Sequence, residues 1–348
     1  MHRRFLCRPA ATELPSLTIA AMRLSVLDQS PIISGLGARR ALEETIALAR
    51  RADELGYHRY WLAEHHAIAA LADPCPEILV ARLGAETKRI RVGTGGVMLP
   101  YYSAFRTAES FRMLEALYPG RIDLGLGRAP GGDGRTAQAV NGGKFPDSDR
   151  FPNQVWELVG HLKESLPSDH PFKNVRLQPE IDTAPEIWLL GSSDYSGALA
   201  AELGLSFAFA HFINPRGGDE VTRFYRDNFK GKNRPGVMVC TFLICAATDA
   251  EAERLAASID LRRLHMALNI DSPVPTAEEA ARHAYSAEER QYVMSQRARA
   301  VIGGPAKCRR ELEEMAALYG ADEMMVLTIT GDYASRLRSY ELLIEAMN

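Results

Sequence analysis

The segment 60–67, YWLAEHHA, is an apolar run that ends in three consecutive ionisable residues, Glu64, His65 and His66. Histidine titrates near neutral pH, so it can transfer protons in catalysis or bind a metal. The two histidines lack the i, i+4 spacing of a helical zinc motif, and His211 would be a distant third ligand. The pair therefore favours acid–base chemistry or polar contact with a ligand over a metal site. Hydrogen bonds to local carbonyl groups are the structural alternative.

A second candidate site is the Gly-Ser-Ser-Asp sequence at 191–194, which opens a predicted helix. Free N–H groups and hydroxyls at a helix N-terminus bind phosphate. Simple capping by Ser192 or Ser193 is the structural alternative. With Arg128 at a neighbouring strand end, the pattern predicts a phosphate site with a cationic clamp.

Two consecutive glycines, Gly95 and Gly96, interrupt a segment that otherwise has the pattern of a strand. Glycine weakens a strand interior, so it often marks a bulge or the close approach of a ligand. Tight packing inside the fold would also require glycine there. The pair is therefore a candidate ligand-binding position with a structural alternative.

The elements that must position these residues are short apolar strands alternating with helices. Strands that are apolar on both faces are typical of an all-parallel sheet. The leading prediction is an α/β fold of the (β/α)8 TIM-barrel type, and a doubly wound open sheet is the alternative. Insertions are expected after strand four, in an irregular segment at 129–152, and after strand seven, at 265–300. The predicted strands are 24–28, 57–63, 90–99, 121–127, 186–190, 205–210, 237–246 and 324–327, and the predicted helices are 38–55, 76–86, 104–118, 153–166, 195–203, 218–230, one from 249, 305–319 and one capped by Asp332.

In a parallel barrel the active site lies at the carboxyl ends of the strands. The candidate residues all follow predicted strands, so the barrel brings them to one rim. They are Glu64, His65 and His66 after strand two, Gly95 and Gly96 at the end of strand three, Arg128 after strand four, Gly191, Ser192, Ser193 and Ser196 after strand five, and His211 and Asn214 after strand six.

Composition restricts the class of protein. The 348 residues include 41 basic and 44 acidic side chains, so no broad basic field is available for nucleic acid or acidic membranes. The longest apolar run, 237–247, is too short to span a bilayer. Five scattered cysteines without a Cys-x-x-Cys pair predict neither disulfides nor zinc and favour the cytoplasm. Residues 1–21 are predicted to be a disordered extension or an upstream start, and 22–348 a single domain.

Longer motifs make the chain resemble the bacterial luciferase-like flavin monooxygenases, from about Met22 to the C-terminus. The matches are W-L-A-E-H-H at 61–66, V-G-T-G-G-V-M-L-P at 92–100, A-E-x-F-R-x-L-E-A-L-x-P-G-R-I-D-L-G-L-G-R at 108–128 and W-L-L-G-S-S at 188–193. The S-V-L-D-Q-S-P start at 25–31 is most similar to that of one branch of the luciferase-like oxidoreductases.

The resemblance implies an FMN cofactor, reduced by a separate flavin reductase, that reacts with molecular oxygen. A flavin peroxide then oxidises a small organic substrate. His65 matches a histidine beside the flavin and is the expected catalytic residue, while Glu64 orients the pair and His66 supports the turn. The family pattern also implies a cis peptide between Gly95 and Gly96.

Further features follow from the same resemblance. Arg128 matches an arginine near the cofactor phosphate, and Gly191, Ser192, Ser193 and Ser196 fall in the phosphate loop. Luciferase has a reactive cysteine where this chain has Gly127, and an acid where it has Ser192, so light emission is not implied. A mobile lid is expected within 265–300, and a homodimer through the helices at 76–86 and 104–118.

Three other functions stay open from the sequence. A barrel oxidoreductase of this fold could use a deazaflavin and transfer hydride without oxygen. A flavin-binding relative could lack catalysis, although it would not need to keep His65. A metal-dependent hydrolase would need three convergent ligands.

Overall fold

The computed structural model of the protein describes residues 22–129 and 132–348, and the predicted extension at 1–21 and Gly131 lie outside these ranges. Eight of its strands are short and almost wholly buried, as the apolar patterns predict. They are β1 (Arg23–Asp28), β2 (Arg59–Leu62), β3 (Arg91–Met98), β4 (Ile122–Gly127), β5 (Glu186–Gly191), β6 (Ser206–Ala210), β7 (Val237–Cys245) and β9 (Glu323–Leu327).

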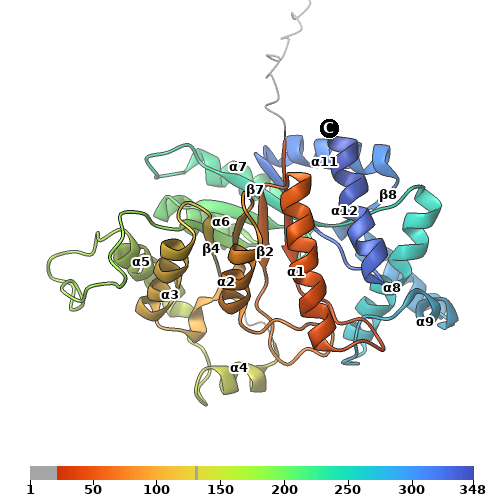
Figure 1. The fold of residues 1–348 in the computed structure, drawn as a ribbon, viewed down its shortest axis with the longest axis horizontal. Coiled ribbons are helices and arrows are strands. Elements are labelled where there is room, and N and C mark those ends of the chain that lie inside the picture. The colour runs from red at the N-terminus through yellow and green to blue at the C-terminus, as the bar shows by residue number, and fades with distance from the viewer. Residues whose placement is uncertain (1–21, 130–131) are drawn as a thin grey trace, which may run out of the picture.

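These strands are parallel and closed into a barrel. They pair in the order β6-β5-β4-β3-β2-β1-β9-β7, and pairing of β6 with β7 closes the ring. The predicted (β/α)8 barrel of TIM type is therefore confirmed, and the open sheet is wrong. Helices pack outside the strands, as Figure 1 shows. They are α1 (Ala38–Leu55), α2 (Pro76–Glu86), α3 (Ala104–Leu117), α5 (Phe151–Leu162), α6 (Asp194–Leu203), α7 (Gly218–Asp227), α8 (Asp249–Ala267), α11 (Pro305–Tyr319) and α12 (Tyr333–Met347), with a short 3-10 turn η1 (Leu99–Tyr101) before α3.

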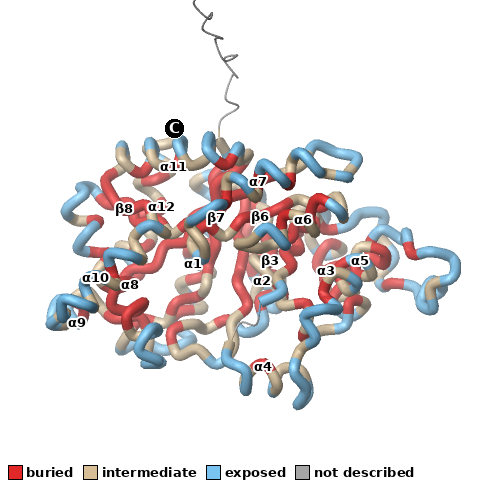
Figure 2. Tube along the Cα trace, turned by 180° about the vertical axis from the view of Figure 1, so that it is seen from behind, coloured by how far each residue is buried: buried red, intermediate tan, exposed pale blue. Residues whose placement is uncertain are grey.

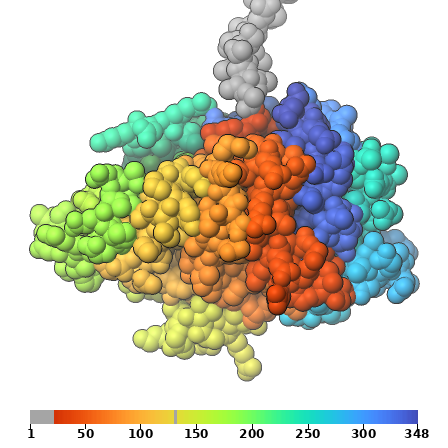
Figure 3. All heavy atoms as spheres, in the orientation of Figure 1, coloured from red at the N-terminus to blue at the C-terminus, as the bar shows by residue number. Residues whose placement is uncertain are grey.

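The insertion after β4 is more regular than predicted. It contains helix α4 (Gly134–Val140) and the turn η2 (Ser148–Arg150). The Asp133 side chain caps α4 by accepting a hydrogen bond from the Thr136 N–H at 2.7 Å. The Gly-rich and Asp-rich composition obscured this short helix because it has almost no buried face. The insertion projects below the barrel in Figures 1 and 3.

The insertion after β7 contains a ninth strand that the sequence did not predict. Strand β8 (Ala300–Gly303) pairs with the carboxyl half of β7, with Phe242 opposite Ala300 and Cys245 opposite Gly303. Two short helices, α9 (Ala277–Arg282) and α10 (Ala287–Gln296), each begin with a capping box, and the turn η3 (Arg297–Arg299) leads into β8. Four residues are too few for a clear strand pattern.

The predicted lid at 265–300 contacts the loops that follow β1 and β2. The Val274 N–H donates to the Ile32 carbonyl at 2.8 Å, and the Ser34 N–H donates to the Val274 carbonyl at 2.8 Å. The Asp271 carboxylate accepts from the Ala69 N–H at 3.0 Å. This part of the segment therefore packs on the rim, and its mobility stays a prediction.

Two layers of core hold the barrel. One lies between the strands and the helices, and the other fills the barrel interior, where the Trp61 and Trp188 rings meet edge to face at 5.6 Å. Figure 2 shows the buried residues running through the central strands. At the amino-terminal ends of the strands the Arg59 guanidinium is buried among Asp123 (2.9 Å), Glu323 (3.1 Å) and Glu186 (3.1 Å).

Candidate functional site

A cavity of about 240 Å³ opens at the carboxyl ends of the strands. Nine of the ten residues predicted for the catalytic and cofactor sites line it, and only His66 does not. Its wall includes Glu64, His65, Gly95, Gly96, Arg128, Gly191, Ser192, Ser193 and Ser196, together with Leu27, Gln29, Trp61, Ala63, Met98, Gly127, Ala129, Leu190, Ala208, Ala210, Phe212, Ile213, Cys240 and Met325.

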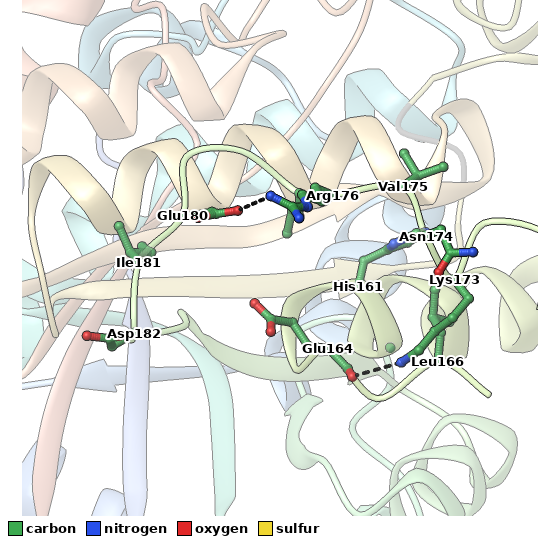
Figure 4. Close-up of a pocket in the computed structure, with 12 residues that line it drawn as sticks. His161, Glu164, Leu166, Lys173, Asn174, Val175, Arg176, Glu180, Ile181 and Asp182 are labelled. Carbon is green, nitrogen blue, oxygen red and sulfur yellow. Dashed lines mark hydrogen bonds and ion pairs between the residues drawn. The ribbon is translucent and has the colours of Figure 1, made fainter. Parts of the chain in front are cut away.

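A larger hollow of about 750 Å³ lies elsewhere, between α5 and the loop that follows it, and no barrel strand contributes to it (Figure 4). Two of its charged side chains, Arg176 and Lys173, are bound by other lining residues. Arg176 faces Glu180 at 3.5 Å, and the Lys173 Nζ donates to the Glu164 carbonyl at 3.4 Å. Since the predicted residues converge on the rim cavity, we assign the candidate site there.

Glu64 is buried, and both of its carboxylate oxygens are hydrogen-bonded to the protein. Its Oε2 accepts from the Met98 N–H at 2.8 Å, and its Oε1 accepts from the Tyr102 hydroxyl at 2.7 Å and contacts the His66 Nε2 at 2.8 Å. The carboxylate thus ties the end of β2 to the end of β3 and to η1. This geometry suits a positioning residue for the strand ends, with His66 as part of the anchor.

His65 differs from its neighbour because it is not bound by Glu64. Its backbone N–H donates to the Asp73 carbonyl at 3.2 Å, which orients the residue. The side-chain Nδ1 is buried and has no hydrogen-bond partner among the described residues. Burial lowers the pKa of His65 to about 4, so the imidazole is neutral at pH 7. A neutral ring in the cavity wall can accept or donate one proton, or hydrogen-bond a ligand.

Asp73, whose backbone carbonyl accepts the bond from His65, has a carboxyl group with a hydrogen bond to only one of its two oxygens in the described structure. Its Oδ1 accepts from the Cys75 N–H at 3.1 Å, while its Oδ2 is buried with no partner in the described structure. Burial raises the pKa of Asp73 to about 7. The folded state therefore holds this proton more tightly than the unfolded state. The contribution of Asp73 to the free energy of unfolding is fully present at low pH and is lost as pH rises through about 7.

Replacing Asp73 by asparagine should remove this pH dependence. From pH 5 to pH 8, the Asp73→Asn variant should gain on the order of 1–3 kcal/mol of unfolding free energy relative to the wild type, since Asn cannot ionise and can keep the bond to Cys75. Urea denaturation of both proteins at pH 5 and at pH 8 measures this difference in unfolding free energy. Asp169→Asn, at an exposed position, is the control. Parallel pH curves for wild type and Asp73→Asn would contradict the expectation.

Gly95 and Gly96 form an irregularity in β3. The register between β3 and β4 shifts between Thr94 and Val97, and the Gly95–Gly96 peptide bond is cis, as the resemblance predicts. A Cβ on Gly95 would lie 2.7 Å from the Leu27 Cδ1, and one on Gly96 would lie 2.6 Å from the Gly125 carbonyl oxygen. Tight packing therefore requires both glycines, and the same backbone lines the cavity. The two interpretations of this glycine pair from the sequence, contact with a ligand and tight packing, are therefore compatible.

The predicted phosphate loop lies at one end of the cavity. Ser193 is the N-cap of α6, yet its side chain makes no capping hydrogen bond, so its hydroxyl is available to a ligand. A Cβ on Gly191 would lie 2.1 Å from the Ser196 Oγ, which shows how closely the helix approaches the strand end. The Arg128 guanidinium lies 4.2 Å from the centroid of the Tyr195 ring, which stacks on it.

Two rim residues noted in the sequence have structural roles. The His211 Nδ1 contacts the Tyr319 hydroxyl at 2.8 Å and its Nε2 the Ala298 carbonyl at 3.2 Å, so this histidine does not line the cavity. The Asn214 Nδ2 donates to the Ser192 carbonyl at 3.0 Å and supports the phosphate loop. Within residues 22–129 and 132–348, no group of three His, Cys, Asp or Glu side chains could hold a metal ion.

The apolar part of the wall was missed from the sequence. Trp61, Ala208, Cys240 and Met325 point inward from four different strands. Successive side chains of a strand alternate between its inner and outer faces. Because both faces are apolar here, the sequence does not show which residues point into the barrel. Cys240 places a thiol in the cavity, and burial raises its pKa, so the protonated form dominates.

A family model described as luciferase-like monooxygenase matches residues 22–323. The chain is also 39% identical over 332 residues to an Escherichia coli (strain K12) protein named luciferase-like monooxygenase, which covers 94% of this chain and 98% of that protein. This chain belongs to the luciferase-like monooxygenase family.

Other members of the luciferase-like family extend the comparison. An N-acetyl-S-alkylcysteine monooxygenase of Bacillus subtilis (strain 168) is 34% identical, over 94% of this chain and 98% of that one. The oxygenase component of a flavin-dependent trigonelline monooxygenase of Acinetobacter baylyi is 33% identical, over 67% of each chain. The solved structure of apo-MsnO8 has a TM-score of 0.84 at 39% identity and covers 93% of this chain and 98% of that one.

The cavity of this luciferase-like protein fits a flavin cofactor. Hydroxyl groups at a helix N-terminus and the Arg128 cation suit a phosphate, and the glycine backbone with Leu27 and Trp61 suits a flat ring. The buried Nδ1 of His65 has no hydrogen-bond partner among the described residues, and His65 lies in the cavity wall. The residues that line the cavity therefore match the flavin cofactor that the family implies.

Proposed function

We propose that this protein is the oxygenase component of a two-component FMN-dependent monooxygenase. It would take reduced FMN from a separate flavin reductase and use molecular oxygen to oxidise a small organic substrate. One observation carries the proposal. A helix N-terminus with free hydroxyls, a cation and a glycine backbone meet a neutral histidine in one cavity at the carboxyl rim.

Each residue has a proposed role in this reaction. Ser192, Ser193 and Ser196 with Arg128 would hold the cofactor phosphate through hydrogen bonds and charge. Gly95 and Gly96 would leave room for the ring to contact the backbone. When bound, the reduced flavin supplies the electrons with which molecular oxygen is activated.

His65 would then act as the catalytic residue. Its neutral imidazole lies in the cavity wall, where it can exchange a proton with a ligand, and the hydrogen bond from its backbone N–H to the Asp73 carbonyl orients the residue. Glu64 and His66, which are bound to each other, would hold the strand ends in place. The apolar wall would exclude water from the reacting groups.

The cofactor and the reaction can be tested together. Anaerobic titrations with reduced FMN and with a reduced deazaflavin should show binding of FMN and little of the deazaflavin. The FMN-loaded protein is then mixed with ¹⁸O-labelled oxygen and a panel of sulfides, aldehydes, ketones and N-acetyl-S-alkylcysteines. We expect one labelled oxygen atom in a product by mass spectrometry. Preference for the deazaflavin, or FMN binding without labelled product across the panel, would count against the proposal.

Gly191→Ala should weaken FMN binding. The new Cβ would lie 2.1 Å from the Ser196 Oγ and 2.2 Å from its Cβ, so rotation of the serine cannot relieve the overlap and the start of α6 must move. We expect about a tenfold or greater loss of affinity for reduced FMN, the loss of one charge-assisted hydrogen bond. Gly37→Ala is the matched control, because Gly37 precedes α1 outside the cavity wall and its Cβ would have no neighbour within 4 Å in the described structure. Equal affinity of both variants would oppose the assignment.

We also propose a homodimer that forms through α2 and α3. Ile78, Met113 and Leu117 are exposed large apolar side chains on these two helices, at 68%, 52% and 52%. Burying them against a second copy would remove apolar surface from water. Ile78→Glu with Leu117→Glu should shift the mass measured by light scattering from dimer to monomer. Met294→Glu, equally exposed at 68% but on α10, should not. A monomeric wild type would end this proposal.

A cytoplasmic location is the last part of the proposal. Cys75, Cys240, Cys245 and Cys308 are free thiols, which suits a reducing compartment. None of the helices in the described ranges is long and apolar enough to cross a membrane.

A further inference from the structure

We propose that Arg263, with Arg297 and Arg299 beside it near the cavity mouth, binds the carboxylate of the substrate, which makes the substrate a small organic monocarboxylic acid. We call these residues the mouth arginines. The inference deepens the proposed function and rests on it for the identity of the bound acid as substrate.

Arg263 is a buried cation without a full set of partners. It lies on α8, is 9% exposed, and its guanidinium stacks 4.5 Å from the centroid of the Phe242 ring. Nη1 donates one long hydrogen bond to the Gln296 carbonyl at 3.4 Å, and the buried Nη2 has no partner among the described residues. An arginine carries five N–H donors, and leaving them unmet in a buried site is costly.

The charges around Arg263 leave an excess of one positive unit. Arg297 is held by Asp260 at 2.5 Å and by Glu253 at 3.1 Å. Burial and the neighbouring cations Arg299 and Arg297 lower the pKa of Arg263 to about 10, although the Asp260 carboxylate raises it, and Arg263 stays charged at pH 7. Three guanidinium groups thus face two carboxylates. Asp260 keeps one unpartnered oxygen, so a dianion would meet repulsion, and a single carboxylate balances the charge.

Arg263 is linked to the candidate site through two aromatic rings, Phe242 and Phe212, and the mouth arginines are not themselves part of the cavity wall. Phe242 and Cys240 are two residues apart on β7, so both side chains project from the same face of the strand. Cys240 lines the cavity, and the Phe242 ring meets the ring of Phe212, another wall residue, edge to face at 5.9 Å. A ligand that extended from the cavity past the Phe212 and Phe242 rings would approach the Arg263 guanidinium.

The apolar wall of the cavity and the mouth arginines together define the substrate class. The inner wall is apolar, with Trp61, Leu190, Cys240 and Met325, and suits an apolar oxidisable group. A guanidinium matches a carboxylate through two parallel hydrogen bonds. The substrate is therefore an acid whose apolar end enters the cavity while its carboxylate stays at the mouth.

Calorimetric binding of acid and methyl ester pairs to the full chain tests the inference. The probes are 3-(methylthio)propanoate, phenylacetate and hexanoate with their methyl esters, measured with the protein alone and after loading with reduced FMN. We expect at least one acid to bind about tenfold or more tightly than its ester, as a charge-assisted hydrogen bond provides. Arg263→Gln should abolish this preference, and Arg263→Lys should keep part of it.

Arg262→Gln is the matched control, because Arg262 is the adjacent buried arginine and has a neighbouring carboxylate of its own, that of Asp271. It should keep the preference for the acid. Equal binding of acids and esters to the wild type, binding of no acid, or an unchanged preference in a folded Arg263→Gln variant would each overturn the inference. Failure of the proposed function appears differently, as a protein that binds acids but not reduced FMN.

Discussion

Replacing His65 by alanine should lower turnover by about 10²- to 10⁴-fold, the usual contribution of a positioned acid or base. The affinity for reduced FMN should change little, because the phosphate loop and Arg128 lie on other strand ends. The measurement is the rate of labelled product formation with a substrate from the oxygen-18 panel, together with an FMN titration. A loss of turnover without a loss of binding would separate a chemical role from a role in holding the cofactor.

His66→Ala is the control for this expectation, because His66 is adjacent in sequence but outside the cavity wall. Its ring contacts the Glu64 carboxylate, so its loss should alter the strand-end anchor and have a smaller effect on turnover. The pH profile adds a second readout. With the pKa of His65 near 4, the wild-type rate should show no inflection from this residue between pH 6 and 8. Full activity of His65→Ala would refute the catalytic assignment.

Arg59→Met should destabilise the folded protein by about 3–5 kcal/mol, the usual result of removing one partner from a buried ionic group. Arg59 is 3% exposed and contacts Asp123, Glu186 and Glu323 at the amino-terminal ends of the strands. Asp123 and Glu323 are fully buried, so both would lose their central cation. Urea unfolding at pH 7 measures the change.

An exposed ion pair supplies the comparison for Arg59. Arg39 pairs with Glu43 on α1 with its side chain 93% exposed, and such pairs contribute about 0–1 kcal/mol. Arg39→Met should therefore leave the unfolding free energy almost unchanged. If Arg59→Met and Arg39→Met unfold at the same urea concentration, the buried network does not stabilise the barrel as argued.

The order of elements was predictable because it depends on local patterns. Buried parallel strands are short apolar runs, and the helices between them carry their own stop signals, such as Gly56 after α1, whose φ is +87°. The alternation then determined that Glu64, His65 and Arg128 follow strands and share one rim. Strand β8 and helix α4 escaped prediction because each is short and has little or no pattern of its own.

By itself, the sequence determined the barrel, the rim and the set of candidate residues, and its motifs pointed to the family. Only the tertiary structure decided what each side chain faces. Glu64 binds His66 and leaves the adjacent His65 in the cavity wall, while His211 bonds to Tyr319. The inward position of Cys240, and the buried Arg263 Nη2 with no partner among the described residues, also appeared only in three dimensions. The physical reason is that partners distant in the chain, and not spacing along it, determine which polar groups are satisfied and which remain for a ligand.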